Sequence, residues 1–197
     1  MSVRDDIYAK AVSLIGMVTP ERSLEMADYI LDHRPEMIVE IGVFGGKSLI
    51  PMAMACRHND HGHVYGIDPW RVDAALEGEN EANQKWWSQN VDLEDMHRKT
   101  MKAIWDHHLD PWVTIVRAQS HTVGRLFHQI DLLNLDGNHS EIASCRDVEW
   151  YLPMVSHGGV VMFDDTDWTS TQKAVSMLMD QCDVIKDDPH YKWFKKR

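Results

Sequence analysis

Cysteine is scarce in this chain, and the thiols that occur are widely spaced. The 197 residues include three cysteines, Cys56, Cys145 and Cys182. An odd number of distant cysteines does not form the framework of a disulfide-stabilised secreted domain. The sequence therefore predicts reduced, structural thiols and a cytoplasmic location.

Long apolar runs and an excess of positive charge are also lacking. The N-terminal stretch MSVRDDIYAK is charged from the start and has no apolar signal-peptide core. No apolar run approaches the ~20 residues that a membrane helix needs. The formal net charge of -11 argues against a protein that grips a nucleic-acid backbone or an anionic membrane. These absences favour a small-molecule substrate, with no membrane partner and no nucleic acid.

The remaining composition is that of a globular protein, with 44% hydrophobic and 26% charged residues. Short apolar runs alternate with helical patterns and no linker interrupts them, so we expect one α/β domain spanning residues 1–197. Strands are predicted at 37–41, 63–67, 113–116, 130–135 and 160–163, and a final hairpin at 183–186 and 191–195. Helices are predicted within 4–18, 20–34, 49–56, 123–127, 140–151 and 171–180. Residues 1–35 form N-terminal helices, and 71–110 reads as a helical insertion or lid of one or two helices.

Carboxylates follow two of the predicted strands directly. Asp136 ends the run 130–135, and Asp164 and Asp165 end the run 160–163. Ligands of open α/β sheets bind beyond the carboxyl ends of the strands, so these acids are expected to meet at one edge. Two charges ~4 Å apart cost on the order of 4 kcal/mol at an effective dielectric of 20. Such a cluster needs protonation or a cation, unless the adjacent acids diverge into a turn and solvent.

A glycine-rich turn, residues 42–48, joins the first strand to a helix. Glycines let a ligand approach the backbone, and a helix N-terminus favours negative groups. Asp68 ends the next strand, near the ~20-residue offset of an acid that binds ribose hydroxyls. Together they indicate an adenosine-type ligand, although the turn alone suits a tight loop and Asp68 alone suits a cap before Pro69. A nucleotide-binding P-loop is the alternative, but its spacing is one residue short, since Ile41 stands where the motif requires glycine.

Residues 40–48 (EIGVFGGKS), 65–70 (YGIDPW) and 130–165 resemble the class I S-adenosylmethionine-dependent methyltransferases. More narrowly, they are similar to metal-dependent macrolide-sugar O-methyltransferases and the cephalosporin-hydroxylase-like group. The resemblance implies a Rossmann-like, doubly wound and mostly parallel seven-stranded sheet, with an antiparallel C-terminal strand and helices on both faces. It implies S-adenosylmethionine as the cofactor. The implied cofactor-binding residues are Glu40, Gly42, Phe44, Gly46, Ser48, Asp68, Gln119, Ser120 and Asp136. Relatives often carry Asp at the position of Gln119.

The resemblance also implies Mg²⁺ held by Asp136, Asp164 and Asp165, with His139 and Asp136 as catalytic residues. Methyl transfer to oxygen needs a positioned and activated hydroxyl, which a metal and a nearby base supply. The ordinary pKa of histidine, ~6.5, suits that base. Asn138 is expected to cap the following helix with Glu141 in a capping box, which makes His139 the first helical residue. The alternative for His139 is a plain capping or surface histidine.

The sequence thus predicts a Mg²⁺-dependent O-methyltransferase for a small vicinal-diol substrate, either a sugar or a catechol-like ring. A catalytically silent binding module of the same fold and a metal-independent methyltransferase remain alternatives, and a homo-oligomer is possible. His58, His61 and His63 lack the acid or cysteine partners of a zinc site. Trp86, Trp87 and Trp168 suit either ring stacking or lid packing, whereas Trp150 is expected in the core.

Overall fold

The computed structural model describes residues 2–197, and strands and helices alternate along most of that length. Seven strands form one sheet in the order β3-β2-β1-β4-β5-β7-β6. The strands are Met37–Ile41 (β1), His63–Ile67 (β2), Val113–Val116 (β3), Ile130–Leu135 (β4), Val155–Phe163 (β5), Cys182–Asp187 (β6) and Lys192–Lys196 (β7). β1 to β5 pair in parallel, while β7 is antiparallel to both β5 and β6. The mostly parallel sheet with its antiparallel last strand is confirmed.

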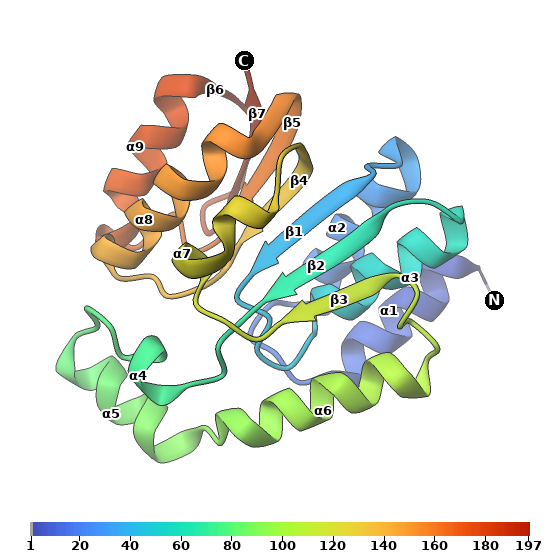
Figure 1. The fold of residues 1–197 in the computed structure, drawn as a ribbon, viewed down its shortest axis with the longest axis horizontal. Coiled ribbons are helices and arrows are strands. Elements are labelled where there is room, and N and C mark those ends of the chain that lie inside the picture. Colours follow the sequence, from blue (N-terminus) through green and yellow to red (C-terminus); the bar gives the residue numbers. More distant parts are fainter. Residues whose placement is uncertain (1) are drawn as a thin grey trace.

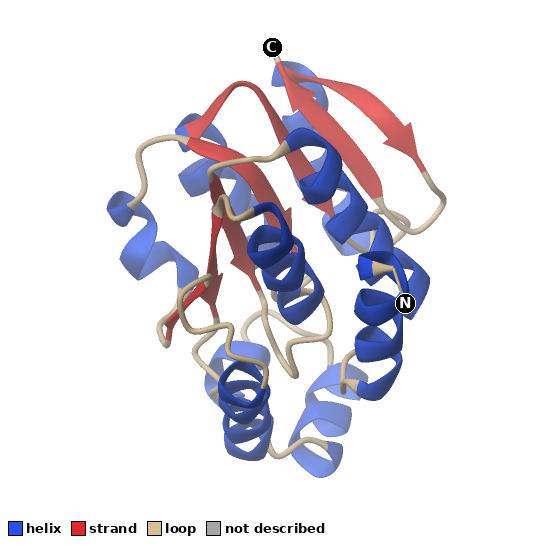
Figure 2. Ribbon diagram, turned by 90° about the vertical axis from the view of Figure 1, so that its right-hand side faces the viewer, coloured by secondary structure: helices blue, strands red, loops and turns tan. Residues whose placement is uncertain are grey.

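Helices cover both faces of the sheet (Figures 1 and 2). The α-helices are Val3–Ser13 (α1), Pro20–His33 (α2), Leu49–Asn59 (α3), Val72–Ala75 (α4), Glu81–Asn90 (α5), Leu93–Asp106 (α6), Ser120–Val123 (α7), Glu141–Tyr151 (α8) and Gln172–Gln181 (α9). Short 3₁₀ turns occupy Gly124–Leu126, Leu152–Met154 and Thr169–Thr171. Across residues 2–197 no helix combines the length and the apolar character required to cross a membrane.

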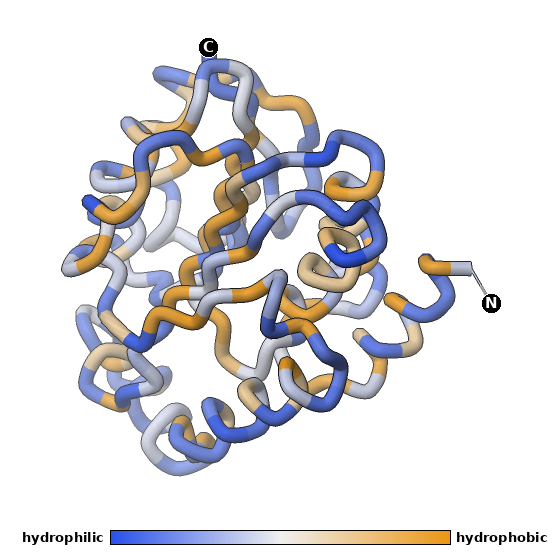
Figure 3. Tube along the Cα trace, turned by 45° about the vertical axis from the view of Figure 1, so that its right-hand side comes forward, coloured by the Kyte–Doolittle hydropathy of each residue, from blue (hydrophilic) through white to orange (hydrophobic). Residues whose placement is uncertain are grey.

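Alternate strand residues supply two hydrophobic cores, one on each face, as the period of two along a strand requires. Ile38 and Leu132 pack toward α1, α2 and α3, whereas Val39 and Leu133 pack toward α8 and α9. The apolar strands run through the middle of the molecule in Figure 3, with polar segments around them. Because both faces are covered, ligands reach the sheet at its strand ends.

The strand register brings the carboxyl ends of the central strands to the same level. Ile41 pairs with Ile67 on one side and Leu135 on the other, and Leu135 pairs with Phe163. The residues that follow these strands therefore start their loops side by side. Gly42 is required there: its φ is +89°, and a Cβ would lie 1.9 Å from the carbonyl oxygen of Asp136.

Several local expectations differ from the structure. Residues 71–110 hold three helices rather than one or two, β5 starts at Val155, and the short helix expected at 123–127 is replaced by α7 and a 3₁₀ turn. Trp150, expected in the core, is 38% exposed and lies under Arg125, whose guanidinium carbon is 6.0 Å from its ring centre. Tyr151 points into the core in its place, because α8 buries one face only.

Candidate active site

A cavity of about 940 Å³ opens at the carboxyl ends of the strands. It is lined by most residues that the sequence predicted for cofactor, metal and catalysis: Gly42, Phe44, Ser48, Asp68, Gln119, Ser120, Asp136, His139, Asp164 and Asp165. Glu40 and Gly46 do not line it: Glu40 is buried at the end of β1, and Gly46 is a buried member of the glycine turn. Sequence elements far apart in the chain therefore share one site.

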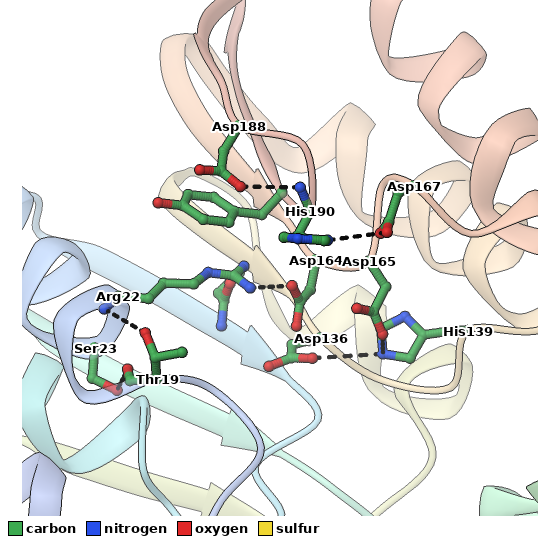
Figure 4. Close-up of polar contacts among 12 residues, drawn as sticks. Thr19, Arg22, Ser23, Asp136, His139, Asp164, Asp165, Asp167, Asp188 and His190 are labelled. Atoms are coloured by element: carbon green, nitrogen blue, oxygen red, sulfur yellow. Dashed lines mark hydrogen bonds and ion pairs between the residues drawn. The ribbon is translucent and has the colours of Figure 1, made fainter.

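The three predicted metal-binding acids and His139 converge within this cavity (Figure 4). His139 Nε2 lies 3.6 Å from an oxygen of Asp136 and 3.4 Å from an oxygen of Asp165. Asp165 has a φ of 48°, a left-handed conformation that is costly for a residue with a side chain. This turn keeps the two adjacent acids, Asp164 and Asp165, on the same side of the site.

Burial and mutual repulsion change the protonation of the acids. Burial, together with the charge of Asp164, raises the pKa of Asp136 to about 7. Burial acts to raise the pKa of Asp164, but the charge of Arg22 and the hydrogen bonds from Asp136 and Arg22 together outweigh it, so the pKa of Asp164 falls below its usual range. One acid therefore stays ionised because a cation faces it, while its neighbour holds a proton more tightly.

Arg22 on α2 is a site residue that the sequence reasoning missed. Its Nη1 donates to a carboxylate oxygen of Asp164, and the two side chains are only 8% and 14% exposed. The guanidinium carbon lies 4.2 Å from the ring centre of Tyr191, while Nε and Nη2 are buried without a partner. The available signal was the spacing of Arg22, Met26 and Ile30 at intervals of four, which places Arg22 on the buried face of α2.

Replacing Arg22 with methionine is expected to destabilise the protein by about 3–5 kcal/mol at neutral pH. The change removes one partner of a buried ion pair and leaves the Asp164 carboxylate without its counter-charge. Urea unfolding measures the loss. A double variant, Arg22→Met with Asp164→Asn, should recover part of it, and the expectation fails if the double variant is as unstable as the sum of the single variants.

Asp136, Asp164 and Asp165 are the side chains that the resemblance implies as Mg²⁺ ligands. Within residues 2–197, no three Asp, Glu, His or Cys side chains already stand in an arrangement that could hold a metal ion. His58, His61 and His63 accordingly form no metal site. The donor chemistry nevertheless fits a hard cation that prefers carboxylate oxygens. When Asp136 loses its proton and His139 is neutral, the three carboxylates and the Arg22 guanidinium together carry two negative charges, which one divalent ion would balance.

The glycine turn is fastened by Asp68. One carboxylate oxygen accepts the backbone N–H groups of Val43 (3.0 Å) and Phe44 (2.9 Å), and the other accepts that of Trp70 (2.7 Å). Phe44 and Trp70 both have positive φ, of 50° and 45°. Burial raises the pKa of Asp68, although these three hydrogen bonds oppose the shift. Asp68 therefore stabilises the left-handed backbone of Phe44 and Trp70 at the cavity wall.

Asp68→Ala is expected to lower the free energy of unfolding by at least about 1–3 kcal/mol, because buried N–H groups lose their acceptor. Asp68→Asn retains one acceptor oxygen and should lose less. Urea denaturation of both variants checks this order. Equal stability of wild type and Asp68→Ala would show that the turn does not depend on the carboxylate.

Glu40 is fully buried beneath the turn, where Oε1 accepts a hydrogen bond from Asn134 (2.8 Å) and Oε2 has no partner. Burial raises the pKa of Glu40 to about 8, while hydrogen bonds from Ser48 and Asn134 act in the opposite direction. At neutral pH the side chain is therefore largely protonated.

The shift of Glu40 predicts a stability that falls as pH rises. The folded state binds the proton more tightly than the unfolded state, whose pKa is the ordinary 4.5, so stability decreases between pH ~4.5 and 8. Glu40→Gln should flatten this decline in urea titrations at several pH values, whereas Glu36→Gln, at an exposed position, should not. An unchanged slope in Glu40→Gln would contradict the assignment.

The loop between β4 and α8 corrects the predicted helix start. Ser140, not Asn138, is the N-cap of α8 and accepts the N–H of Ala143, so His139 precedes the helix. Burial lowers the pKa of His139, but the hydrogen bond and charge of Asp136, with the charge of Asp165, outweigh it and the net shift is upward. His139 is thus held among carboxylates by the loop.

The opposite end of the cavity lies between Ser120 and α8. The Ser120 hydroxyl donates to Asp147, whose pKa is raised to about 6 by burial. Trp86 and Trp87 of α5 line the cavity from the lid side, and the ring of Trp87 meets that of Phe44 edge-on, with the ring centres 5.8 Å apart. Trp168 lies 5.5 Å from the ring of His139. All three predicted tryptophans therefore border the site.

The sheet order, the glycine turn and the acid at the end of β2 define a class I S-adenosylmethionine-dependent methyltransferase. The methyltransferase-domain family matches residues 39–166, more than half of the 197-residue chain. The chain belongs to this family, and this assignment replaces the P-loop alternative. Comparison with curated proteins gives no match.

Solved structures at low sequence identity share the fold. The SAH-bound methyltransferase PaMTH1 of Podospora anserina has a TM-score of 0.71 at 13% identity, over 100% of this chain and 88% of that one. The O-methyltransferase NovP has a TM-score of 0.71 at 19% identity, over 92% and 81% of the two chains. An O-methyltransferase of Bacillus cereus in complex with SAH has a TM-score of 0.65 at 13% identity, over 100% and 91%.

Proposed function

We propose that this enzyme transfers the methyl group of S-adenosylmethionine to a hydroxyl of a small vicinal diol, either a sugar or a catechol-like ring, with Mg²⁺. The observation that carries the proposal is the convergence of Asp136, Asp164, Asp165 and His139 in one cavity with the glycine turn. The likeness to O-methyltransferases such as NovP supports transfer to oxygen.

The cofactor is proposed to lie along the glycine turn. Gly42, Phe44 and Ser48 would face the methionine part, Asp68 the ribose, and Gln119 with Ser120 the adenine. All six of these residues line the cavity. Glu40, buried beneath the turn, and Gly46, which has a φ of +80° within it, would act by shaping the turn. Asp136, which follows the neighbouring strand β4, would lie beside the methionine part of the cofactor.

The metal would be held by Asp136, Asp164 and Asp165. When bound, Mg²⁺ lowers the pKa of the acceptor hydroxyl and fixes its oxygen. The two negative charges that the cluster carries when all three acids are ionised and His139 is neutral support this proposal. Arg22 keeps Asp164 ionised, and a hard carboxylate set suits Mg²⁺ better than a soft metal.

His139 is proposed as the base. Its Nε2 takes the proton of the acceptor hydroxyl as the new O–C bond forms and the C–S bond breaks, and S-adenosylhomocysteine leaves. Asp136 and Asp165, both within 3.6 Å of Nε2, stabilise the imidazolium that results. The lid residues Trp86 and Trp87 exclude water from the sulfonium side.

A matched pair of acceptors tests the diol requirement. We expect methyl transfer from labelled S-adenosylmethionine to catechol or a sugar diol, and much weaker transfer to phenol or a deoxy sugar that lacks one of the two hydroxyls. Equal turnover of diol and single-hydroxyl acceptors would reject the diol requirement, and no transfer to any oxygen acceptor would reject the proposed function.

The protein is also proposed to be cytoplasmic. The three buried, free thiols support this location.

A further inference from the structure

Asn138 makes contacts that neither helix capping nor the proposed chemistry explains. Its side-chain nitrogen donates toward three backbone carbonyl oxygens, those of Ala74 (3.1 Å), Ala75 (3.2 Å) and Glu77 (2.9 Å). Its side-chain oxygen accepts the N–H of Ser140 at 2.8 Å. The donor group of Asn138 is therefore committed to a segment more than 60 residues earlier in the chain.

That segment belongs to the lid, which we define as residues 71–90 with α4 and α5. The lid lies beyond the carboxyl ends of β1 and β2 in Figure 1. Neither α4 nor α5 contains a buried residue, and Ala75 and Trp87 of these helices are only partly buried where they pack against the core. Segments with few buried contacts open more readily than the rest of a structure.

Two further contacts fix the same part of the lid to α8. Arg146 donates two hydrogen bonds to the Glu77 carboxylate, at 2.8 and 2.7 Å. Gly78, with φ of +71°, sits so close to Ser140 that a Cβ would lie 2.8 Å from the hydroxyl oxygen. The lid thus docks on the loop and first turns of α8 mainly through polar groups.

The position of Asn138 in the sequence connects this docking to the chemistry. It lies between Asp136 and His139 on the loop from β4 to α8, and the lid residues Trp86 and Trp87 line the same cavity as these two side chains. Opening of the lid would remove the partners of the Asn138 amide and free this loop. Closure of the lid would hold the β4–α8 loop in place through the Asn138 amide.

We propose that Asn138 is a positioning residue, a latch that keeps the lid closed over the cofactor and thereby sets the loop that carries Asp136 and His139. The inference rests on the proposed function for its catalytic consequence, but the latch itself concerns the protein without any ligand. Because Asn138 joins the lid to this loop, closure of the lid over the bound cofactor would also place His139, the proposed base.

The test combines hydrogen exchange with kinetics on the full chain. Asn138→Asp keeps an oxygen for the Ser140 N–H but places a carboxylate against three carbonyl oxygens. We expect amide exchange in residues 71–90 of the cofactor-free protein to accelerate roughly tenfold, as the loss of hydrogen bonds implies. We also expect kcat to fall at least tenfold, with a smaller change in the KM of the acceptor, because the side-chain amide of Asn138 is already bonded to the lid carbonyls and to the Ser140 N–H.

Two control variants separate a latch from general destabilisation. Arg146→Met breaks the Glu77 pair and leaves the β4–α8 loop intact, so it should accelerate lid exchange in the same residues. Ala174→Gly weakens the buried face of α9, which packs with α8 and not with the lid, and should leave exchange in the lid unchanged. Unchanged lid exchange in Asn138→Asp, or faster exchange with wild-type kcat, would overturn the proposal. Exchange of the ligand-free protein decides the latch even if no methyl acceptor is found, so failure of the proposed function is recognised separately.

Discussion

Replacing His139 with alanine is expected to lower kcat by about 10²–10⁴-fold, the usual contribution of a general base. Affinity for S-adenosylmethionine should stay near that of wild type, because the imidazole faces Asp136 and Asp165 rather than the glycine turn. Single-turnover methyl transfer measures the chemical step, and calorimetry measures the affinity. His139→Gln should be as slow as His139→Ala, since the amide keeps polarity without basicity.

His63→Ala supplies the matched control. His63 starts β2 at the opposite end of the strand and lies 2.8 Å from the Thr114 hydroxyl, so its loss should not slow methyl transfer. Wild-type kcat in His139→Ala would exclude this residue as the base. A fall in kcat of equal size in both variants would indicate a structural effect instead.

Removal of divalent cations is expected to lower kcat/KM by roughly 10²–10³-fold, because Lewis-acid stabilisation contributes several kcal/mol and each 1.36 kcal/mol changes a rate tenfold. Added Mg²⁺ should restore the rate. The kcat/KM of Asp164→Asn should be as low as that of the metal-free enzyme, and added Mg²⁺ should not restore it, because the variant removes one carboxylate of the cluster.

Asp167→Asn is the control for this prediction. Asp167 lies three residues along the same turn, is 42% exposed and pairs with His190 rather than with the cluster, so it should keep its response to Mg²⁺. Full activity in chelator would contradict the metal proposal. Arg22 would then be the permanent cation of the cluster, and the enzyme would be metal-independent.

The strands and their acids were predictable because local patterns determine them. Apolar runs indicate strands buried on both faces, and parallel pairing places Gly42, Asp68, Asp136 and Asp164 at one edge. The resemblance then supplied the seven-stranded sheet with its antiparallel C-terminal strand. In this part of the molecule, the position of a residue at the end of a strand is enough to predict which other residues lie beside it.

The contacts made by Arg22 and Asn138 were not predictable in the same way. Arg22 meets Asp164 across 142 positions of sequence, and only its place on the buried stripe of α2 hinted at a role. Asn138 looked like a helix cap, but its partners are backbone carbonyls of the lid, which leave no signature in residue types. Both depend on how a helix or lid packs against the sheet edge.

Calorimetric titration of the wild-type chain with S-adenosylmethionine tests the central claim most directly. The account predicts saturable binding of one cofactor molecule per chain, weakened in Asp68→Ala, and no comparable binding of ATP. Binding of ATP without S-adenosylmethionine, or no heat from S-adenosylmethionine either with or without Mg²⁺, would contradict it.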